Sequence, residues 1–151
     1  DGVLTVDVPA EEAGEWAAPL REHGLDPIAL VAPTTRAERL PLMLGSAAGF
    51  VYYVSMAGVT GGEGLDVASV RSHVAPLREH TELPIGVGFG VRDADSAAAV
   101  AEVADAVVVG SALIRTIEGH LAEPESLPSR LREQVSALRE GVDRNRIGKE
   151  S

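Results

Sequence analysis

The stretch Phe50-Val51-Tyr52-Tyr53-Val54-Ser55 is the clearest strand signal in the sequence. It consists almost wholly of aromatic and β-branched residues, which are enriched in strands. Four glycines follow within residues 58–64, and a helical pattern then runs from about Val67 to His80. A strand, a glycine-rich loop and a helix in this order form the repeating unit of a parallel β/α protein.

The same unit occurs along the whole chain. Apolar runs at residues 3–8, 27–32, 84–90 and 106–110 are each followed by a helical pattern. This alternation predicts right-handed βαβ units and a parallel sheet. Two architectures satisfy the pattern: a doubly wound open sheet and part of a (β/α)8 barrel.

The first predicted helix has clear signals at both ends. Pro9 suits the first turn, Glu11 and Glu12 complement the helix dipole, and Gly24 is a C-terminal stop. Pro19 is expected to kink or break this helix, because proline removes a backbone hydrogen bond.

Two later helices have candidate N-caps, and the last has a regular apolar stripe. Thr35 is predicted to cap a helix from Ala37 to about Leu44, and Asp93 or Asp95 to cap a helix over residues 96–103. The stripe predicts one amphipathic helix, formed by Leu127, Leu131, Val135, Leu138 and Val142. We therefore divide the chain into a folded part, residues 1–142, and a polar, frayed tail, residues 143–151.

Composition excludes several classes of protein. The chain has 151 residues, a formal net charge of -10 and no cysteine. Disulfides and thiolate metal sites are therefore ruled out, in keeping with the cytoplasm. The charge disfavours nucleic acid and anionic membranes, and no apolar run approaches the roughly 18 residues of a membrane span. A phosphate ligand would also be repelled, so any phosphate site must rely on local backbone dipoles.

Three glycine clusters lie at the ends of consecutive predicted strands: residues 58–64, 88–90, and Gly110-Ser111. Ligands of parallel β/α folds bind at this edge, where glycine lets backbone N–H groups approach a phosphate. Each glycine alone could simply make a turn, but three clusters favour a phosphate site. The dinucleotide fingerprint and the P-loop lysine are both absent.

Other polar residues carry weaker signals. Asp7 ends the first predicted strand at the same edge. It is either a polar neighbour of an active site, or a solvated strand-end acid or helix-capping group. Tyr52 and Tyr53 must point to opposite faces of the sheet. The histidines are expected near helix C-terminal ends, away from the glycines and without metal-ligand spacing; they are His23, His73, His80 and His120.

These residues together resemble a known family. The matching stretches, from residue 1 to about 140, are those at residues 1–9, 30–35, 50–61, 88–91 and 109–112. They resemble the tryptophan synthase alpha subunit, and Tyr52-Tyr53-Val54-Ser55 with Gly58-Val59-Thr60-Gly61 is the most specific stretch. The resemblance implies a partial (β/α)8 (TIM) barrel made of strands four to eight. It also implies a lyase that cleaves indole-3-glycerol phosphate to indole and glyceraldehyde 3-phosphate in tryptophan biosynthesis.

The resemblance also implies roles for single residues. Gly61, Gly90, Gly110 and Ser111 would bind the substrate phosphate, Phe89 and Val108 would line the indole pocket, and Tyr52 would be a supporting active-site tyrosine. Thr60 would belong to a mobile loop, and Asp7 and Pro9 would face a beta subunit. Pyridoxal phosphate belongs to that subunit, so no cofactor and no metal are expected here.

The family's two catalytic carboxylates have no counterpart in residues 1–151. Because the sequence opens directly in a strand, we expect a fragment that is inactive alone and has open sheet edges. The alternatives are a non-catalytic half-barrel that binds phosphate or a partner, and one that self-associates. Another phosphate-binding barrel, such as indole-glycerol-phosphate synthase or a pentose-phosphate epimerase, would share the glycines but not the tyrosine-containing stretch.

Overall fold

The computed structural model describes residues 1–55, 67–88 and 90–144. The elements follow in the order β1 (Gly2–Leu4), η1 (Ala10–Glu12), α1 (Ala13–Glu22), β2 (Asp26–Val31), η2 (Ala37–Arg39), α2 (Leu40–Gly45), β3 (Val51–Val54), α3 (Val67–Leu77), β4 (Ile85–Gly88), α4 (Ala94–Ala101), β5 (Ala106–Val108), α5 (Ser111–Glu118), η3 (Pro124–Ser126) and α6 (Leu127–Arg144), where η marks a 3₁₀ turn. All five predicted strands are confirmed; β2 is as long as its apolar run, and the other four are shorter than theirs.

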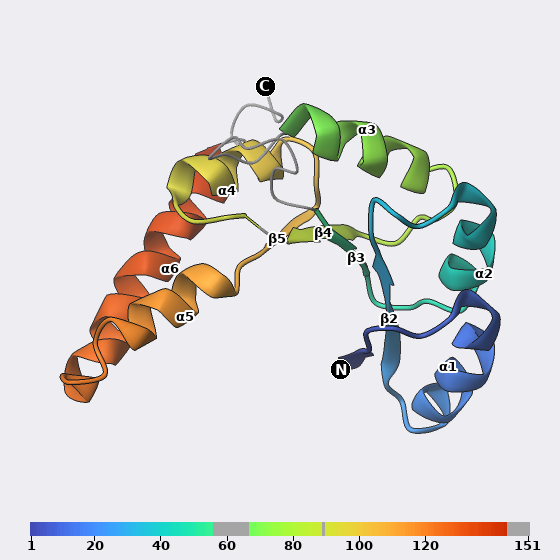
Figure 1. The fold of residues 1–151 in the computed structure, drawn as a ribbon, viewed down its shortest axis with the longest axis horizontal. Coiled ribbons are helices and arrows are strands. Elements are labelled where there is room, and N and C mark those ends of the chain that lie inside the picture. Colours follow the sequence, from blue (N-terminus) through green and yellow to red (C-terminus); the bar gives the residue numbers. More distant parts are fainter. Residues whose placement is uncertain (56–66, 89, 145–151) are drawn as a thin grey trace.

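The five strands form one parallel sheet in the order β1-β2-β3-β4-β5. A doubly wound sheet would reverse its strand order at a switch point, whereas a barrel keeps the sequence order. Right-handed crossovers between sequential strands put their helices on one face. Figure 1 shows the helices along the outside of an arch, with the sheet curling beneath them. The structure is therefore a partial barrel.

The outer face of the sheet carries the core. Val51, Ile85 and Val87 have no exposed surface, and Tyr53 is 2% exposed. Buried residues of the helices pack on them: Leu40, Leu44, Val70, Val74, Leu77, Ala97, Val100 and Leu138. Strands buried by helices in this way explain why the apolar runs are nearly continuous.

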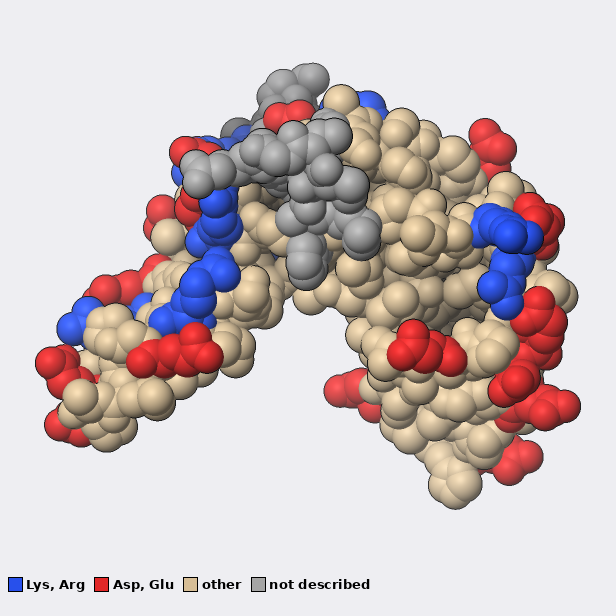
Figure 2. Space-filling view, viewed as in Figure 1, with Lys and Arg blue, Asp and Glu red and all other residues tan. Residues whose placement is uncertain are grey.

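The opposite face looks into the hollow of the arch. Register places Leu30 beside Tyr52, Tyr52 beside Gly86, and Gly88 beside Val108 on this inner face. The hollow is bordered mainly by uncharged residues (Figure 2). Leu4 of β1 is 43% exposed, which is high for a leucine in a parallel sheet.

Several helix-end predictions are confirmed. Asp93 caps α4: its carboxylate accepts from Ser96 N–H at 2.8 Å, and Ser96 Oγ accepts from Asp93 N–H at 3.1 Å. Gly24 follows α1 with a φ of 69°. The last helix runs to Arg144, so the first two residues of the predicted tail are helical.

Of the two effects predicted for Pro19, a break in the first helix is excluded, because α1 continues through Pro19 to Glu22. One prediction about a helix N-cap is wrong. Thr35 does not cap the next helix. Its hydroxyl instead accepts from Ala32 N–H at 3.1 Å, and Arg36 is the N-cap residue of η2. The hydroxyl thus serves the turn that precedes the helix.

No helix within the described ranges is both long and apolar enough to cross a membrane.

Candidate phosphate site at the carboxyl edge of the sheet

The turn between β5 and α5 is the best-defined part of the candidate site. Gly110 is the N-cap of α5, and its carbonyl accepts from Leu113 N–H at 2.9 Å and Ile114 N–H at 3.2 Å. Ser111 is the first helical residue and is exposed. The first N–H groups of a helix have no partner within it and point out of its end. A Cβ at Gly110 would meet no atom of the described residues within 4 Å, so this part of the chain leaves the space before the helix open.

The loop after β4 lies beside this turn, because β4 and β5 are neighbours in the sheet. Gly90 has a φ of 80°, a conformation that residues with a Cβ rarely adopt. Asp93 then starts α4 with its capping box. Gly90 and the Gly110-Ser111 turn therefore lie on adjacent strand ends, as an anion held between two loops requires.

The two tyrosines point to opposite faces, as predicted. Tyr52 lies on the inner face over Gly88, where an added Cβ would come within 2.7 Å of the Tyr52 ring. Tyr53 lies in the outer core, stacked on His73 with ring centroids 6.0 Å apart. Burial raises the pKa of Tyr53. Tyr52 is therefore the tyrosine that faces the hollow, and Tyr53 is part of the core.

The inner face beneath the candidate site is apolar. A Cβ at Gly86 would approach the Phe50 ring at 3.3 Å and Val108 Cγ2 at 3.6 Å, so these two side chains lie on either side of the glycine. Val108 thus faces the hollow, as an indole pocket would need. Ser55 joins the ends of β3 and β4, since its N–H and Oγ both donate to Gly88 O, at 3.0 and 3.2 Å.

The other predicted site residues fall into two groups. Gly61, Thr60 and Phe89, with the predicted mobile loop, lie outside the described residues. Asp7 and Pro9 are exposed beyond β1, and Asp7 has a φ of 60°. An aspartate tolerates this left-handed conformation better than most residues. The structure brings Tyr52, Val108, Gly90, Gly110 and Ser111 to one edge of the sheet, as parallel strand ends require.

The five strands carry a single carboxylate, Asp26. It is the first residue of β2 and therefore lies at the amino edge, opposite the glycine turns. Within the described ranges, no three His, Cys, Asp or Glu residues are grouped to hold a metal ion. The strands thus supply no acid or base near the candidate phosphate site.

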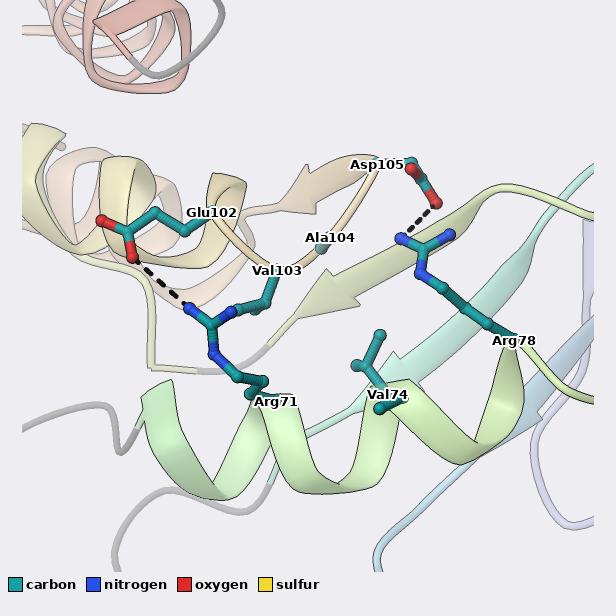
Figure 3. A pocket seen from close by; sticks show the side chains of 8 residues that line it. Arg71, Val74, Arg78, Glu102, Val103, Ala104 and Asp105 are labelled. Carbon is teal, nitrogen blue, oxygen red and sulfur yellow. Dashed lines mark ion pairs between the residues drawn. The ribbon is translucent and has the colours of Figure 1, made fainter. Parts of the chain in front are cut away.

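A separate pocket of about 390 Å³ lies between α3 and the α4–β5 connection (Figure 3). Two ion pairs span it, Arg71–Glu102 at 3.7 Å and Arg78–Asp105 at 3.0 Å. Asp105 also accepts from Ile85 N–H at 2.9 Å, so it ties the starts of β4 and β5 together. This pocket lies at the amino edge of the sheet, away from the glycine turns.

Three of the four histidines contact a carbonyl of their own helix. Each of His23, His73 and His120 places Nδ1 within 2.8 Å of the carbonyl four residues earlier. His73 lies about one turn before Leu77, the last residue of α3, and it also stacks on Tyr53 of the core.

Comparison with known proteins identifies the family. The family model described as tryptophan synthase alpha chain matches residues 1–143. The chain belongs to the tryptophan synthase alpha chain family. It is 52% identical over 143 residues to the tryptophan synthase alpha chain of Thioalkalivibrio sulfidiphilus, covering 95% of this chain and 54% of that protein. It is also 52% identical to the one from Halorhodospira halophila, over all of this chain and 55% of that protein.

Solved structures agree with this assignment to the tryptophan synthase alpha chain family. The crystal structure of tryptophan synthase subunit alpha from Legionella pneumophila superposes with a TM-score of 0.80 at 36% identity, covering 95% of this chain and 52% of that one. A tryptophan synthase structure from M. tuberculosis gives 0.75 at 37% identity, covering 93% and 50%. The chain therefore spans about half the length of the relatives it matches.

Two contacts of α6 with neighbouring helices could not be predicted from the sequence. Gln134 of α6 contacts the first turn of α5, and Gly141 packs against the backbone of α4. Neither has a local signal: a lone glutamine on a charged helix and a glycine near a helix end are common. A glycine inside the apolar stripe, next to Val142, was the one available clue.

Proposed function

We propose that this chain forms the phosphate-binding part of a tryptophan synthase alpha subunit, a lyase of tryptophan biosynthesis. Its substrate would be indole-3-glycerol phosphate, split by a retro-aldol step into indole and glyceraldehyde 3-phosphate. The observation that carries the proposal is the Gly110-Ser111 turn, which is adjacent to Gly90 and which the described residues leave open in front of α5. Family membership supports the choice of ligand.

The proposed binding mode follows from the electrostatics. With a net charge of -10, the protein repels a phosphate dianion at long range, so close donors must hold it. The N–H groups at the start of α5 and the Ser111 hydroxyl would donate to phosphate oxygens, and the helix dipole would add to their attraction. Gly90 would complete this cradle together with Gly61. The indole ring would lie on the apolar inner face, against Val108 and Phe89, with Tyr52 beside it.

The proton chemistry of a retro-aldol step needs an acid and a base. Breaking the bond between the ring and the glycerol chain requires a proton on the ring carbon and removal of one from a hydroxyl. Asp26, the one strand carboxylate, lies at the wrong edge. We therefore propose that residues 1–151 alone bind the phosphate but do not cleave the substrate.

The proposed partner is the tryptophan synthase beta subunit, which would carry the pyridoxal phosphate; no cofactor is proposed for this chain. Asp7 and Pro9 are exposed near the carboxyl end of β1, where a partner could reach them. Thr60 would belong to the loop that closes over the substrate.

Two assays test the proposal. Indole release from indole-3-glycerol phosphate should be undetectable with the purified chain, and measurable release would refute its inactivity. Calorimetric titration with glycerol 3-phosphate should give saturable binding that Ser111→Ala weakens severalfold. Glu118→Gln, at the other end of α5, is the control and should leave the affinity unchanged. Absence of any heat with the unaltered chain would refute the phosphate site.

A further inference from the structure

The C-terminal helix α6 contacts the two helices that follow the candidate phosphate loops. Figure 1 shows α6 alongside α4 and α5. At α4, a Cβ on Gly141 would collide with the Ala94 backbone, since it would lie 2.9 Å from Ala94 Cα and still closer to the carbonyl. Gly141 is accordingly buried, and the two helices touch backbone to backbone at the first residue of α4.

At α5, the contact is polar and involves a single side chain. Gln134 Nε2 donates to Ala112 O at 3.3 Å, and Gln134 Oε1 accepts from Thr116 Oγ1 at 2.8 Å. Ala112 and Thr116 are one helical turn apart. One planar amide therefore holds α5 at two points, Ala112 in its first turn and Thr116 in its second.

Chemistry fixes the orientation of this amide. A backbone carbonyl only accepts, so the group facing Ala112 O must be the NH₂ of Gln134. The Thr116 hydroxyl has one proton and two acceptors, Gln134 Oε1 at 2.8 Å and Ala112 O at 3.3 Å, and the nearer one is favoured. All three residues are buried or half-buried, so water competes little for these bonds.

The first turn of α5 begins with Ser111, which is adjacent to Ala112. The direction of this first turn determines where its free N–H groups point. Apolar packing of Leu113 beneath the helix leaves rotation about the helix axis weakly defined, whereas two directional hydrogen bonds oppose it. Because α6 also packs against Ala94, it contacts both helices that follow the candidate phosphate loops. It therefore fixes the position of one loop relative to the other.

We propose that Gln134 is a positioning residue for the phosphate site: by holding Ala112 and Thr116, it aims the first turn of α5 at the ligand. This inference rests on the proposed phosphate-binding function. Gln134 itself touches no ligand. A mere packing role would predict equal effects on stability and binding, whereas positioning predicts a larger effect on binding.

The test uses the full 151-residue chain, two readouts of the site, and the urea midpoint as a measure of overall stability. The variants are Gln134→Met, which keeps the length of the side chain without its hydrogen bonds, and Thr116→Val, with Thr116→Ser as the conservative rescue. Ser136→Ala, exposed on the same helix, is the control. The first readout is amide hydrogen exchange at Leu113 and Ile114 without ligand, and the second is glycerol 3-phosphate affinity by calorimetry.

We expect Gln134→Met and Thr116→Val to speed exchange severalfold and weaken binding by roughly three- to tenfold. Thr116→Ser and Ser136→Ala should match the unaltered chain, and the urea midpoint of Thr116→Val should move little. Unchanged exchange in Gln134→Met, or unchanged affinity, would overturn the role of Gln134. Failure of the unaltered chain to bind would instead overturn the phosphate site, and the exchange readout, which needs no ligand, tells the two failures apart.

Discussion

The two faces of the sheet differ sharply, although they belong to the same strands. On the outer face Val51, Ile85 and Val87 are fully buried by helices of this chain. On the inner side Leu4 is 43% exposed, and Val6, just beyond β1, is 61% exposed. In a closed barrel, side chains from all strands would fill this interior. The chain thus completes its own outer layer, while its candidate site lies along the layer that it leaves open.

The largest expected effect is the difference in stability between a charge placed on the outer face and one placed on the inner face of the same strand. Val51 and Val54 both belong to β3 and point to opposite faces. Val51→Asp would bury an unpaired charge and should cost about 4 kcal/mol or more in the free energy of unfolding. Val54→Asp, on the half-buried inner side, should cost about 1 kcal/mol. Urea unfolding measures both, and equal losses would contradict the difference between the faces.

The next effect concerns the inner face alone. In Gly88→Ala the new methyl would meet the Tyr52 ring, so the tyrosine must move, at a cost of about 1–3 kcal/mol. Near-ultraviolet circular dichroism should report the displaced ring. Gly110→Ala, whose methyl would enter open space, is the control and should leave that signal unchanged. An unaltered spectrum in Gly88→Ala would show that Tyr52 does not lie over the glycine.

The open inner side should also promote self-association. Leu4 lies in the edge strand β1, where unpaired backbone groups and apolar surface favour pairing with another chain. Sedimentation should show a mass that rises with concentration, and Leu4→Lys should weaken association about tenfold, or roughly 1.4 kcal/mol. Leu42→Lys, equally apolar and 55% exposed but on α2, should have no such effect. Identical behaviour of the two variants would argue against the sheet as the contact.

The smallest expected effect concerns the N-cap of α4, one of the helices that cover the outer face. Asp93→Ala removes the cap of α4 and should cost about 1 kcal/mol. Hydrogen bonds from the Ser96 N–H and then the Ser96 hydroxyl lower the pKa of Asp93. A lowered folded-state pKa means that this stabilisation is complete above the unfolded value of about 3.9 and is lost as the pH falls through the folded value.

Stability measured against pH tests this. The difference between the unaltered chain and Asp93→Ala should be constant near neutral pH and should shrink below about pH 4. A difference that grew on acidification would contradict the assigned hydrogen bonds.

The sequence predicted what depends on local pattern and missed what depends on distant contacts. Apolar runs located all five strands, and Asp93 was recognised because a capping box is local. Thr35 was misassigned because a threonine can serve a turn as readily as a helix. The stacking of His73 on Tyr53 was not predicted, because the two residues lie twenty positions apart in the sequence.

The candidate site likewise has parts that the sequence predicted and parts that it did not. Glycines at strand ends gave Gly90 and Gly110, since parallel strands bring their carboxyl ends together. The contact of Gln134 with Ala112 joins residues 22 positions apart on two helices, and no periodicity encodes it. The direction in which α5 points therefore had to come from the structure.

We propose above that the chain holds a phosphate at the turns after β4 and β5. Titration of the ¹⁵N-labelled chain with glycerol 3-phosphate, followed by amide NMR, tests this site most directly. We expect saturable chemical-shift changes that are largest at Gly90, Gly110 and Ser111, with little change at Asp26 on the opposite edge. Shifts spread over the surface without saturation, or centred on Arg71 and Arg78, would contradict it.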